Sequence, residues 1–329
     1  MNDAAPTHVP AISARALSKH YGRVLAVDGL DLEIPSGQFF GLLGPNGSGK
    51  TTTIHMLSTL LRPTAGEATV AGHDTRRMPV AVRGVIGVVF QDSALDRTLS
   101  VAENLRFCGL LYGLERRTIE ERSGELLDLF GLAEMRKRPV GSLSGGQRRA
   151  LDIVRGVMHR PRILFLDEPT TGLDLPNRRR IWRFIERLRA QTGMTVLLTT
   201  HYLEEADGCD QVAFIHAGRI VERGAPAELV ARLGRHVIEI EGARLDDVIA
   251  LLEPRLGPAL REGDVAMFRY PDEDVSALAR LQADARGAIS ALRWRRPNLN
   301  DVFLWVNAAQ PAQGAADARE PPRPTSLAS

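Results

Sequence analysis

The sequence predicts an α/β fold: a mostly parallel β-sheet with an antiparallel flank and a helical insertion, followed by a small α+β domain. Short, almost wholly apolar runs recur between helical patterns, at residues 39–43, 85–90, 163–166 and 195–198. Runs of this kind are typical of strands covered on both faces, as in a parallel sheet. Between Asp96 and Val140 the strand signals stop, which indicates the helical insertion.

The flank is predicted by alternation of apolar and polar side chains. Residues 12–21 and 24–34 alternate in this way, as expected for strands that are buried on one face. Residues 211–223 predict a strand, a turn at Ala217 and Gly218, and a second strand. We interpret these segments together as the antiparallel flank.

The helical insertion covers about residues 93–145 of a first domain that spans residues 1–234. Helical periodicity dominates residues 101–112 and 118–130. Gly131 follows the second pattern and is placed to end a helix.

A second domain is predicted over residues 235–306. Its segments read as strands at 236–241, 265–270 and 289–294, with helices at 245–252 and 275–285. This order is close to the ferredoxin-like plan. Residues 307–329 are dominated by Ala, Pro and Gly, which predicts a disordered tail.

Composition excludes several classes of protein. The 329 residues, 44% hydrophobic and 25% charged, are typical of a globular chain of about two domains. The formal net charge of +2 is too small for the electrostatic field of the chain to indicate a nucleic-acid partner. Two distant cysteines, Cys108 and Cys209, suggest neither a disulfide framework nor a zinc site. No run of about 18 apolar residues and no signal peptide is evident, so we expect a chain that neither crosses nor is exported through a membrane.

The first chemical pattern is a P-loop between the apolar run at 39–43 and a helical pattern at 52–61, which begins with Thr52. It reads Gly44, Pro45, Asn46, Gly47, Ser48, Gly49, Lys50, Thr51. Glycines let backbone N–H groups surround phosphate oxygens at a helix N-terminus. Lys50 would neutralise the β and γ phosphates, and Thr51 would bind Mg²⁺. A simple helix-capping turn or a dinucleotide fingerprint fits this spacing and context less well.

The second pattern is an apolar run, 163–166, that ends in two carboxylates, Asp167 and Glu168. Side chains alternate along a strand, so the two carboxylates should point to opposite sides and divide the work. Asp167 would hold Mg²⁺, and Glu168 would act as general base toward the attacking water. A solvated acidic turn is the alternative, but two carboxylates ending a buried strand are costly without a cation.

The third pattern is Leu143, Ser144, Gly145, Gly146, Gln147. Ser144 is a favourable N-cap for a helix over 147–158, and the two glycines leave its first N–H groups open to an anion. Alone, this is only a capped helix. Together with the two preceding patterns it resembles the signature of the ATP-binding cassette (ABC) family, and the resemblance covers about residues 12–234.

The resemblance implies the nucleotide-binding domain fold of that family and further site residues. Tyr21 matches the aromatic on which adenine stacks, and Gln91 matches the glutamine that contacts Mg²⁺ and the water. Asp174 matches the aspartate of the D-loop, and His201 matches the histidine that contacts the γ-phosphate. The sequence departs at Leu175, where many relatives have Pro.

The resemblance also implies partners. Family geometry places ATP between the P-loop of one subunit and the signature segment of another, so we expect a second ATP-binding subunit, in a homodimer, and a separate integral-membrane permease. The chain would then lie peripherally at the cytoplasmic face of the membrane. The stretch after Gln91 and residues 297–304 resemble drug-export subunits of the daunorubicin-resistance type. Near the C-terminus we expect an apolar lid, made of Val302, Phe303, Leu304, Trp305.

Two alternatives remain open at this stage. One is a soluble ABC ATPase that acts on ribosomes or nucleic acid, although the sequence has one P-loop and no sustained heptads. The other is an ATP-sensing module that never hydrolyses. The presence of both carboxylates and of His201 argues against it.

Overall fold

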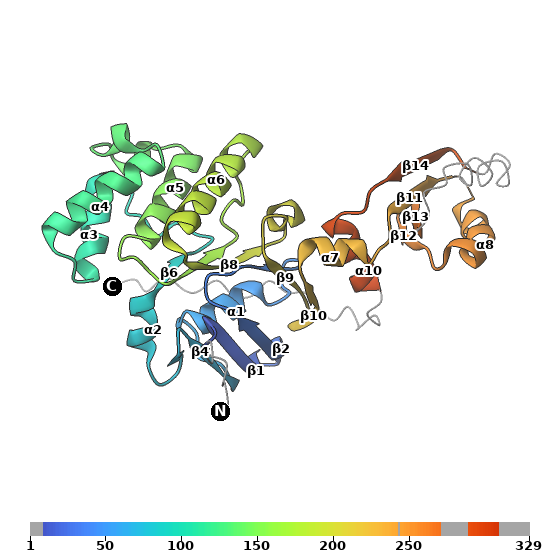
Figure 1. Ribbon diagram of the computed structural model, residues 1–329, viewed down its shortest axis with the longest axis horizontal. Helices are drawn as coiled ribbons and strands as arrows, with labels where there is room; N and C mark the ends of the chain where they lie inside the picture. Colours follow the sequence, from blue (N-terminus) through green and yellow to red (C-terminus); the bar gives the residue numbers. More distant parts are fainter. Residues whose placement is uncertain (1–8, 243, 271–288, 309–329) are drawn as a thin grey trace, which may run out of the picture. The chain divides into compact units, whose positions relative to one another are not determined.

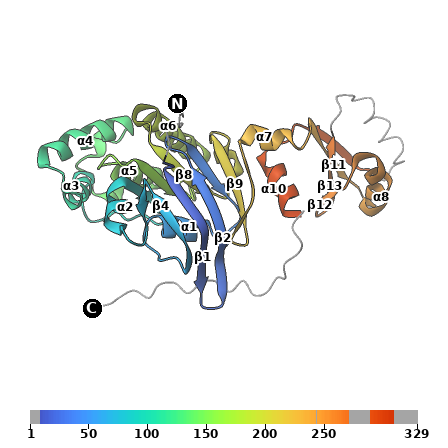
Figure 2. The same cartoon turned by 60° about the horizontal axis from the view of Figure 1, so that its bottom comes forward.

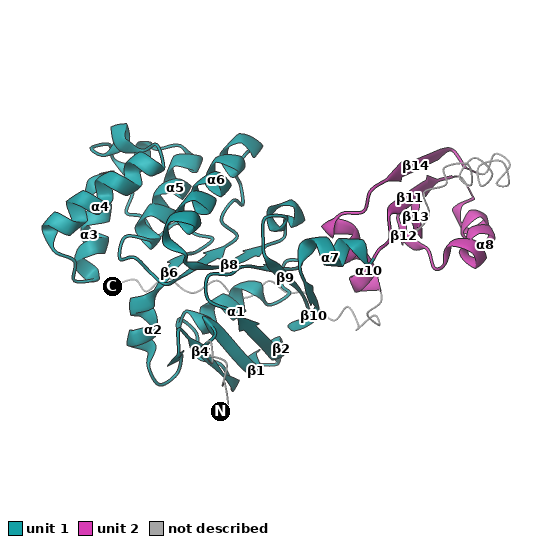
Figure 3. Ribbon diagram, in the orientation of Figure 1, with its two compact units in different colours: residues 1–232 teal, residues 233–329 magenta. Residues whose placement is uncertain are grey.

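The computed structural model describes residues 9–242, 244–270 and 289–308. The chain folds into two compact units, residues 1–232 and 233–329 (Figure 3). Each unit is built around its own β-structure, and the nucleotide patterns of the sequence all lie in the first.

The centre of the first unit is a six-stranded sheet in the order β10-β9-β3-β8-β7-β6 (Figure 1). Its strands are β3 (Phe39–Leu43), β6 (Ile86–Val89), β7 (Ile163–Asp167), β8 (Thr195–Thr200), β9 (Gln211–His216) and β10 (Arg219–Gly224). Neighbours pair in parallel except β10, which runs antiparallel to β9. Every residue of β3, β7 and β8 is buried. The strands expected from the apolar runs are therefore confirmed.

A second, fully antiparallel sheet has the order β2-β1-β4-β5. It contains β1 (Ile12–Tyr21), β2 (Val24–Ile34), β4 (Ala65–Val70) and β5 (His73–Asp74). The expected flank is thus present, but the assignment of residues 211–223 to it is wrong. β9 pairs in parallel with β3, and its residues 212–215 are fully buried, so it belongs to the central sheet.

One apolar core joins the two sheets through helix α1 (Lys50–Leu57). It contains Ile12 and Ile34 of the antiparallel sheet, Ile54 of α1, and Phe40 and Phe165 of the central sheet. The helix begins two residues before the predicted 52–61 segment and ends earlier. Its N-terminus is therefore fixed between two packed sheets (Figure 2).

The insertion is helical, as predicted. α3 (Val101–Leu111) and α4 (Arg116–Leu129) contact each other and α5 (Gly145–Gly156), and α5 contacts α6 (Leu175–Thr192) (Figure 1). Short helices α2 (Pro79–Val85) and α7 (Pro226–Ala231) and three 3₁₀ turns complete the unit. α5 begins at Gly145, two residues before the prediction, because the capping Ser144 precedes it directly.

The second unit contains an antiparallel sheet in the order β12-β13-β11-β14. Its elements are β11 (His236–Glu241), α8 (Leu245–Leu256), β12 (Leu260–Glu262), β13 (Val265–Tyr270), β14 (Ala291–Arg295) and α10 (Leu299–Ala308). The helix expected at 275–285 lies outside the described residues. The tail was expected over residues 307–329, but residues 307 and 308 belong to α10, and the rest of the tail lies outside the described residues.

Both faces of this sheet are covered. Ile238 and Phe268 form a core with residues of α8 on one face. On the other, Leu304 and Trp305 of α10 pack against the cluster of Val237, Leu260, Met267. The apolar lid expected near the C-terminus is thus a helix that packs on the sheet. No helix within the described part of the chain is long and apolar enough to cross a membrane.

Candidate nucleotide site

The P-loop joins β3 to α1 at the carboxyl edge of the central sheet, and its backbone leaves no room for side chains at two glycines. A Cβ at Gly44 would lie 2.3 Å from the Ile215 carbonyl oxygen. Gly49, the residue that precedes α1, has φ 107°, and a Cβ there would lie 2.6 Å from the Ala26 carbonyl oxygen. Glycine is required at both positions because neighbouring backbone approaches so closely.

Lys50 closes over this loop. Its Nζ donates hydrogen bonds to the carbonyl oxygens of Gly44, at 2.8 Å, and Pro45, at 2.9 Å, and lies 3.5 Å from Glu168 Oε1. Burial lowers the pKa of the Lys50 ammonium, and the nearby Glu168 carboxylate opposes that shift. The ammonium is therefore held at the loop, where it can meet a phosphate.

Thr51 and Asp167 lie together beside Lys50. Thr51 Oγ1 donates to Asp167 Oδ1 at 3.1 Å, and Thr199 Oγ1 donates to the same oxygen at 2.6 Å. Burial raises the pKa of Asp167, whereas the two hydroxyl hydrogen bonds lower it. A hydroxyl and a carboxylate at this separation are oxygen donors of the kind that Mg²⁺ prefers, with phosphates and waters completing the shell.

Glu168 has a strained backbone, with φ 45° in the left-handed region. Such a conformation costs a non-glycine residue about 1–3 kcal/mol and is typical of functional sites. Its Oε2 lies 3.2 Å from Nδ1 of His201 and accepts a hydrogen bond from Thr171 Oγ1 at 3.1 Å. The structure thus brings Lys50, Glu168 and His201 together.

This geometry corrects one step of the sequence argument. We expected Asp167 and Glu168 to face opposite sides because strand side chains alternate. β7 ends at Asp167, and the positive φ at Glu168 turns the chain. Both carboxylates consequently approach the start of α1, Asp167 at Thr51 and Glu168 at Lys50.

The signature segment forms a capping box at the start of α5. Gln147 N–H donates to Ser144 Oγ at 3.2 Å, and Ser144 N–H donates to Gln147 Oε1 at 2.9 Å. Gly145 is exposed, and a Cβ at Gly146 would lie 2.6 Å from Oδ1 of Asn177. Among the described residues, no hydrogen bond or ion pair joins residues 144–147 to residues 44–51.

Three predicted site residues stand apart from the P-loop. Asp174 Oδ1 accepts a hydrogen bond from Asn177 N at 3.0 Å and so caps α6. Gln91 has an exposed side chain. Tyr21 is 48% exposed, with Lys19 Nζ 5.4 Å from its ring centroid. No interaction within the described residues brings these side chains to Lys50, Asp167 or Glu168.

Two residues that hold the site residues in place were not predicted from the sequence. Thr199 lies near the end of a buried strand, two residues before His201, and its hydroxyl orients Asp167. Its place so close to His201 is a sequence signal that could have marked it as a site residue. Arg149 donates to the backbone of both the Gln91 and the Glu168 segments, and no sequence signal marks it.

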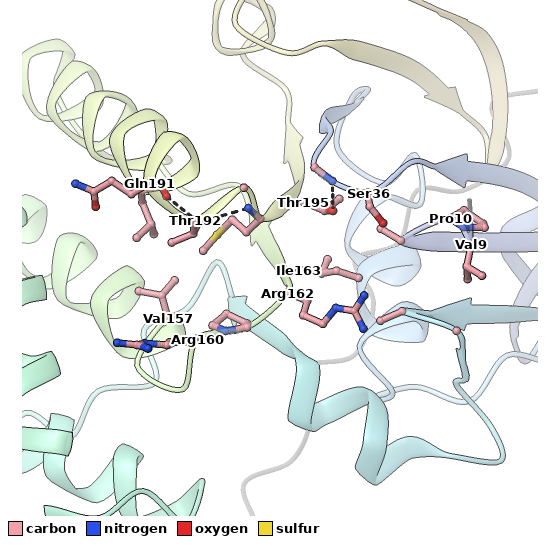
Figure 4. Close-up of a pocket in the computed structure, with 18 of the residues that line it drawn as sticks. Val9, Pro10, Ser36, Val157, Arg160, Arg162, Ile163, Gln191, Thr192 and Thr195 are labelled. Carbon is pink, nitrogen blue, oxygen red and sulfur yellow. Dashed lines mark hydrogen bonds between the residues drawn. The ribbon is translucent and has the colours of Figure 1, made fainter. Parts of the chain in front are cut away.

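The structure also has a cavity of about 920 Å³ elsewhere in the first unit. Its lining includes Gly37, Arg162 and Met194, which precede β3, β7 and β8 (Figure 4). It therefore lies at the amino ends of these parallel strands, whereas the P-loop follows the carboxyl end of β3. The cavity is distinct from the nucleotide site.

Comparison with known proteins shows the family to which the chain belongs. The family described as "ABC transporter" matches residues 27–171. The daunorubicin/doxorubicin resistance ATP-binding protein DrrA of Streptomyces peucetius is 43% identical over 93% of this chain and 90% of its own length. The Nod factor export ATP-binding protein I of Ralstonia nicotianae is 39% identical, covering 90% of this chain and 93% of that protein.

Solved structures extend the similarity to the fold. An ATP-binding subunit of an ABC transporter superposes with a TM-score of 0.61 at 26% identity, covering 68% of this chain and 92% of that one. A dimeric ATP-binding cassette in a post-hydrolysis state, bound to ADP and phosphate, superposes with a TM-score of 0.60 at 25% identity. The match covers 65% of this chain and 98% of that one. The chain belongs to the ABC transporter family and is an ATP-binding, ATP-hydrolysing subunit.

Proposed function

We propose that this chain hydrolyses ATP to power the export of a hydrophobic drug, lipid or polysaccharide through a separate membrane permease. The observation that carries the proposal is near-full-length similarity to proteins named for drug resistance and Nod factor export. None of these names supports the alternative of an ATPase acting on ribosomes or nucleic acid. We assign ATP binding to residues 1–234 and a separate α+β domain to residues 235–306.

For hydrolysis, we assign the general base to Glu168 and the γ-phosphate contact to His201. The Glu168 carboxylate would take a proton from the attacking water, while Lys50 neutralises charge on the phosphates. Mg²⁺, when bound to Thr51 and Asp167, supplies electrostatic stabilisation of the phosphates. Gln91, whose side chain is exposed in this structure, would contact the metal and the water.

The nucleotide contacts that we propose lie on two chains. Tyr21, Thr52 and residues 44–51 would bind ATP from one subunit. Residues 144–147 and Asp174 would complete the site from a second copy. In the described part of the chain, no hydrogen bond or ion pair joins residues 144–147 to the P-loop of the same chain, which supports this proposal. ATP would then stabilise the closed pair by the free energy that the γ-phosphate gains from the second subunit.

Replacing Glu168 by Gln tests the hydrolytic assignment. The amide cannot accept the proton, so we expect turnover to fall by roughly 10²- to 10⁴-fold, the usual range for a lost general base. Nucleotide affinity should be retained, because Lys50 and the P-loop are unchanged. Phosphate release and equilibrium binding of ATP by the purified variant measure the two quantities. An unchanged turnover would contradict the role of Glu168.

A permease surface is suggested by the exposed end of α3. Phe107 is 61% exposed, Leu110 50% and Leu111 70%, and a gathered set of exposed apolar side chains is typical of interaction sites. We propose that this patch contacts the permease, so that the chain lies peripherally at the cytoplasmic face of the membrane.

Detergent extraction of cells tests the partner. The tagged chain should copurify with a multi-spanning membrane protein, and Phe107→Ser with Leu111→Ser should lose that protein while basal ATPase activity persists. Leu60→Ser is the matched control, since Leu60 is also 60% exposed but lies outside the insertion. Recovery of the chain without any membrane protein, in cells that contain the permease, would contradict the proposal.

A further inference from the structure

Arg149 lies on α5, two residues after the signature segment, and its side chain is turned inward. The residue is only 8% exposed. Within the described residues, all the hydrogen bonds of its guanidinium go to backbone carbonyl oxygens, those of Phe90, Gln91, Asp167, Glu168, Pro169. Arginine has five N–H donors in a planar fork, and here they reach two separate segments of chain.

These two segments follow neighbouring strands of the central sheet. The ladder between β6 and β7 ends at the pair Val89 and Leu166. Beyond this pair, Nη1 reaches Gln91 O at 3.5 Å and Nη2 reaches Glu168 O at 3.0 Å. The guanidinium therefore bridges the two chains at the point where backbone pairing stops.

The contact fixes the peptide next to the proposed general base. Glu168 N–H donates to the Thr199 carbonyl oxygen at 3.0 Å, and its own carbonyl oxygen accepts from Arg149. The backbone N–H and the carbonyl group of Glu168, whose φ is 45°, are thus both held by hydrogen bonds. The direction of the Glu168 carboxylate, toward Lys50 and His201, depends on that backbone.

The environment favours a guanidinium over other cations. Burial lowers the pKa of Arg149, and the nearby carboxylates of Asp152, Asp167 and Asp92 raise it. Arginine remains charged under such conditions. Its five donors are spread over a planar fork, whereas the three donors of a lysine ammonium are all on one nitrogen atom. An ammonium has too few donors to bond all five carbonyl oxygens.

We propose that Arg149 is a positioning residue for ATP hydrolysis that holds the Gln91 and Glu168 segments in fixed register. Through it, a displacement of the Gln91 loop changes the orientation of the general base, and the signature helix moves with both. The inference rests on the role of Glu168 under the proposed function.

The variants Arg149→Met and Arg149→Lys test the inference, because a positioning residue should change kcat but not the affinity for ATP. Small misplacements of a catalytic group cost up to about 10²-fold, so we expect kcat to fall by roughly 10- to 100-fold in both variants while the Kd for ATP stays within about twofold. The lysine variant retains charge and should still fail to restore turnover.

Arg122→Met is the matched control. Arg122 is also largely buried and donates to two carbonyl oxygens, those of Met158 and Val157, at 3.1 Å each, just beyond the C-terminal end of α5. This variant should lose thermal stability yet keep kcat. If both Arg149 variants fold and keep kcat within about twofold of the unsubstituted chain, the inference is overturned.

A double-substitution cycle separates this inference from the assignment of Glu168. If Arg149 acts through Glu168, adding Arg149→Met to Glu168→Gln should lower turnover no further. Additive losses would overturn the positioning role while leaving the general base intact. Full turnover in Glu168→Gln alone would instead contradict the general-base assignment.

Discussion

At the scale of single residues, the proposed chemistry depends on charged side chains that are buried, although such side chains are usually exposed to water. Lys50 is buried against carbonyl oxygens, and Asp167 is buried against hydroxyls. The sequence identified both of them, because a P-loop and a paired carboxylate are local patterns. It could not predict the left-handed backbone of Glu168 or the five acceptors of Arg149, because these depend on where the segments meet in space.

His159 gives a residue-scale prediction about pH. Its ring stacks on Tyr112 at 3.6 Å, and its Nε2 lies 2.8 Å from the Ile86 carbonyl oxygen. Burial lowers the pKa of His159, and the field of Arg122 lowers it further, against the Ile86 hydrogen bond. The native state therefore binds this proton less readily than the unfolded chain, and its contribution to stability is present above the unfolded pKa.

That contribution should be lost as the pH falls below about 6.5, with a slope of up to about 1.4 kcal/mol per pH unit. Urea unfolding between pH 7.5 and 5.5 measures it. His159→Phe, which keeps an aromatic ring on Tyr112, should lose stability less steeply than the unsubstituted chain. Equal slopes in the two proteins would refute the assignment.

At the scale of elements, some strands and helices were predicted nearly to the residue, and others were not predicted at all. β1, β2 and β3 begin and end where the sequence indicated, because side-chain alternation or continuous burial defines them. α6 was not predicted, although it has 18 residues. It carries many arginines, and its apolar face contains few residues, such as Ile181, Phe184 and Leu188. A sparse face of this kind gives a weak periodic signal.

The start of α6 provides an element-scale prediction. Asp174 caps this helix through Asn177 N–H, so part of its importance is structural. Asp174→Ala should lower the unfolding free energy by about 1 kcal/mol, whereas Asp174→Asn, another favourable N-cap, should cost little. Chemical denaturation compares the two variants. If alanine and asparagine are equally stable, Asp174 does not stabilise α6 as an N-cap.

At the scale of the whole molecule, we propose that one chain provides two incomplete halves of a nucleotide site. The P-loop meets the carboxylates and His201 within the chain. Among the described residues, however, no hydrogen bond or ion pair joins the capped signature segment to the P-loop. The resemblance to ABC proteins predicted this division. The sequence could not show the separation itself, because nothing in it reports the distance between residues 44–51 and 144–147.

The most direct test is the mass of the Glu168→Gln protein in solution with Mg²⁺ and ATP, measured by light scattering. The chain has a mass of 36.0 kDa. Under the proposed function the second subunit recognises the γ-phosphate, so we predict that saturating ATP doubles the particle mass and that ADP does not. Lys50→Ala, added to the same protein, should abolish the doubling. A particle that keeps the mass of one chain at saturating ATP would contradict the account.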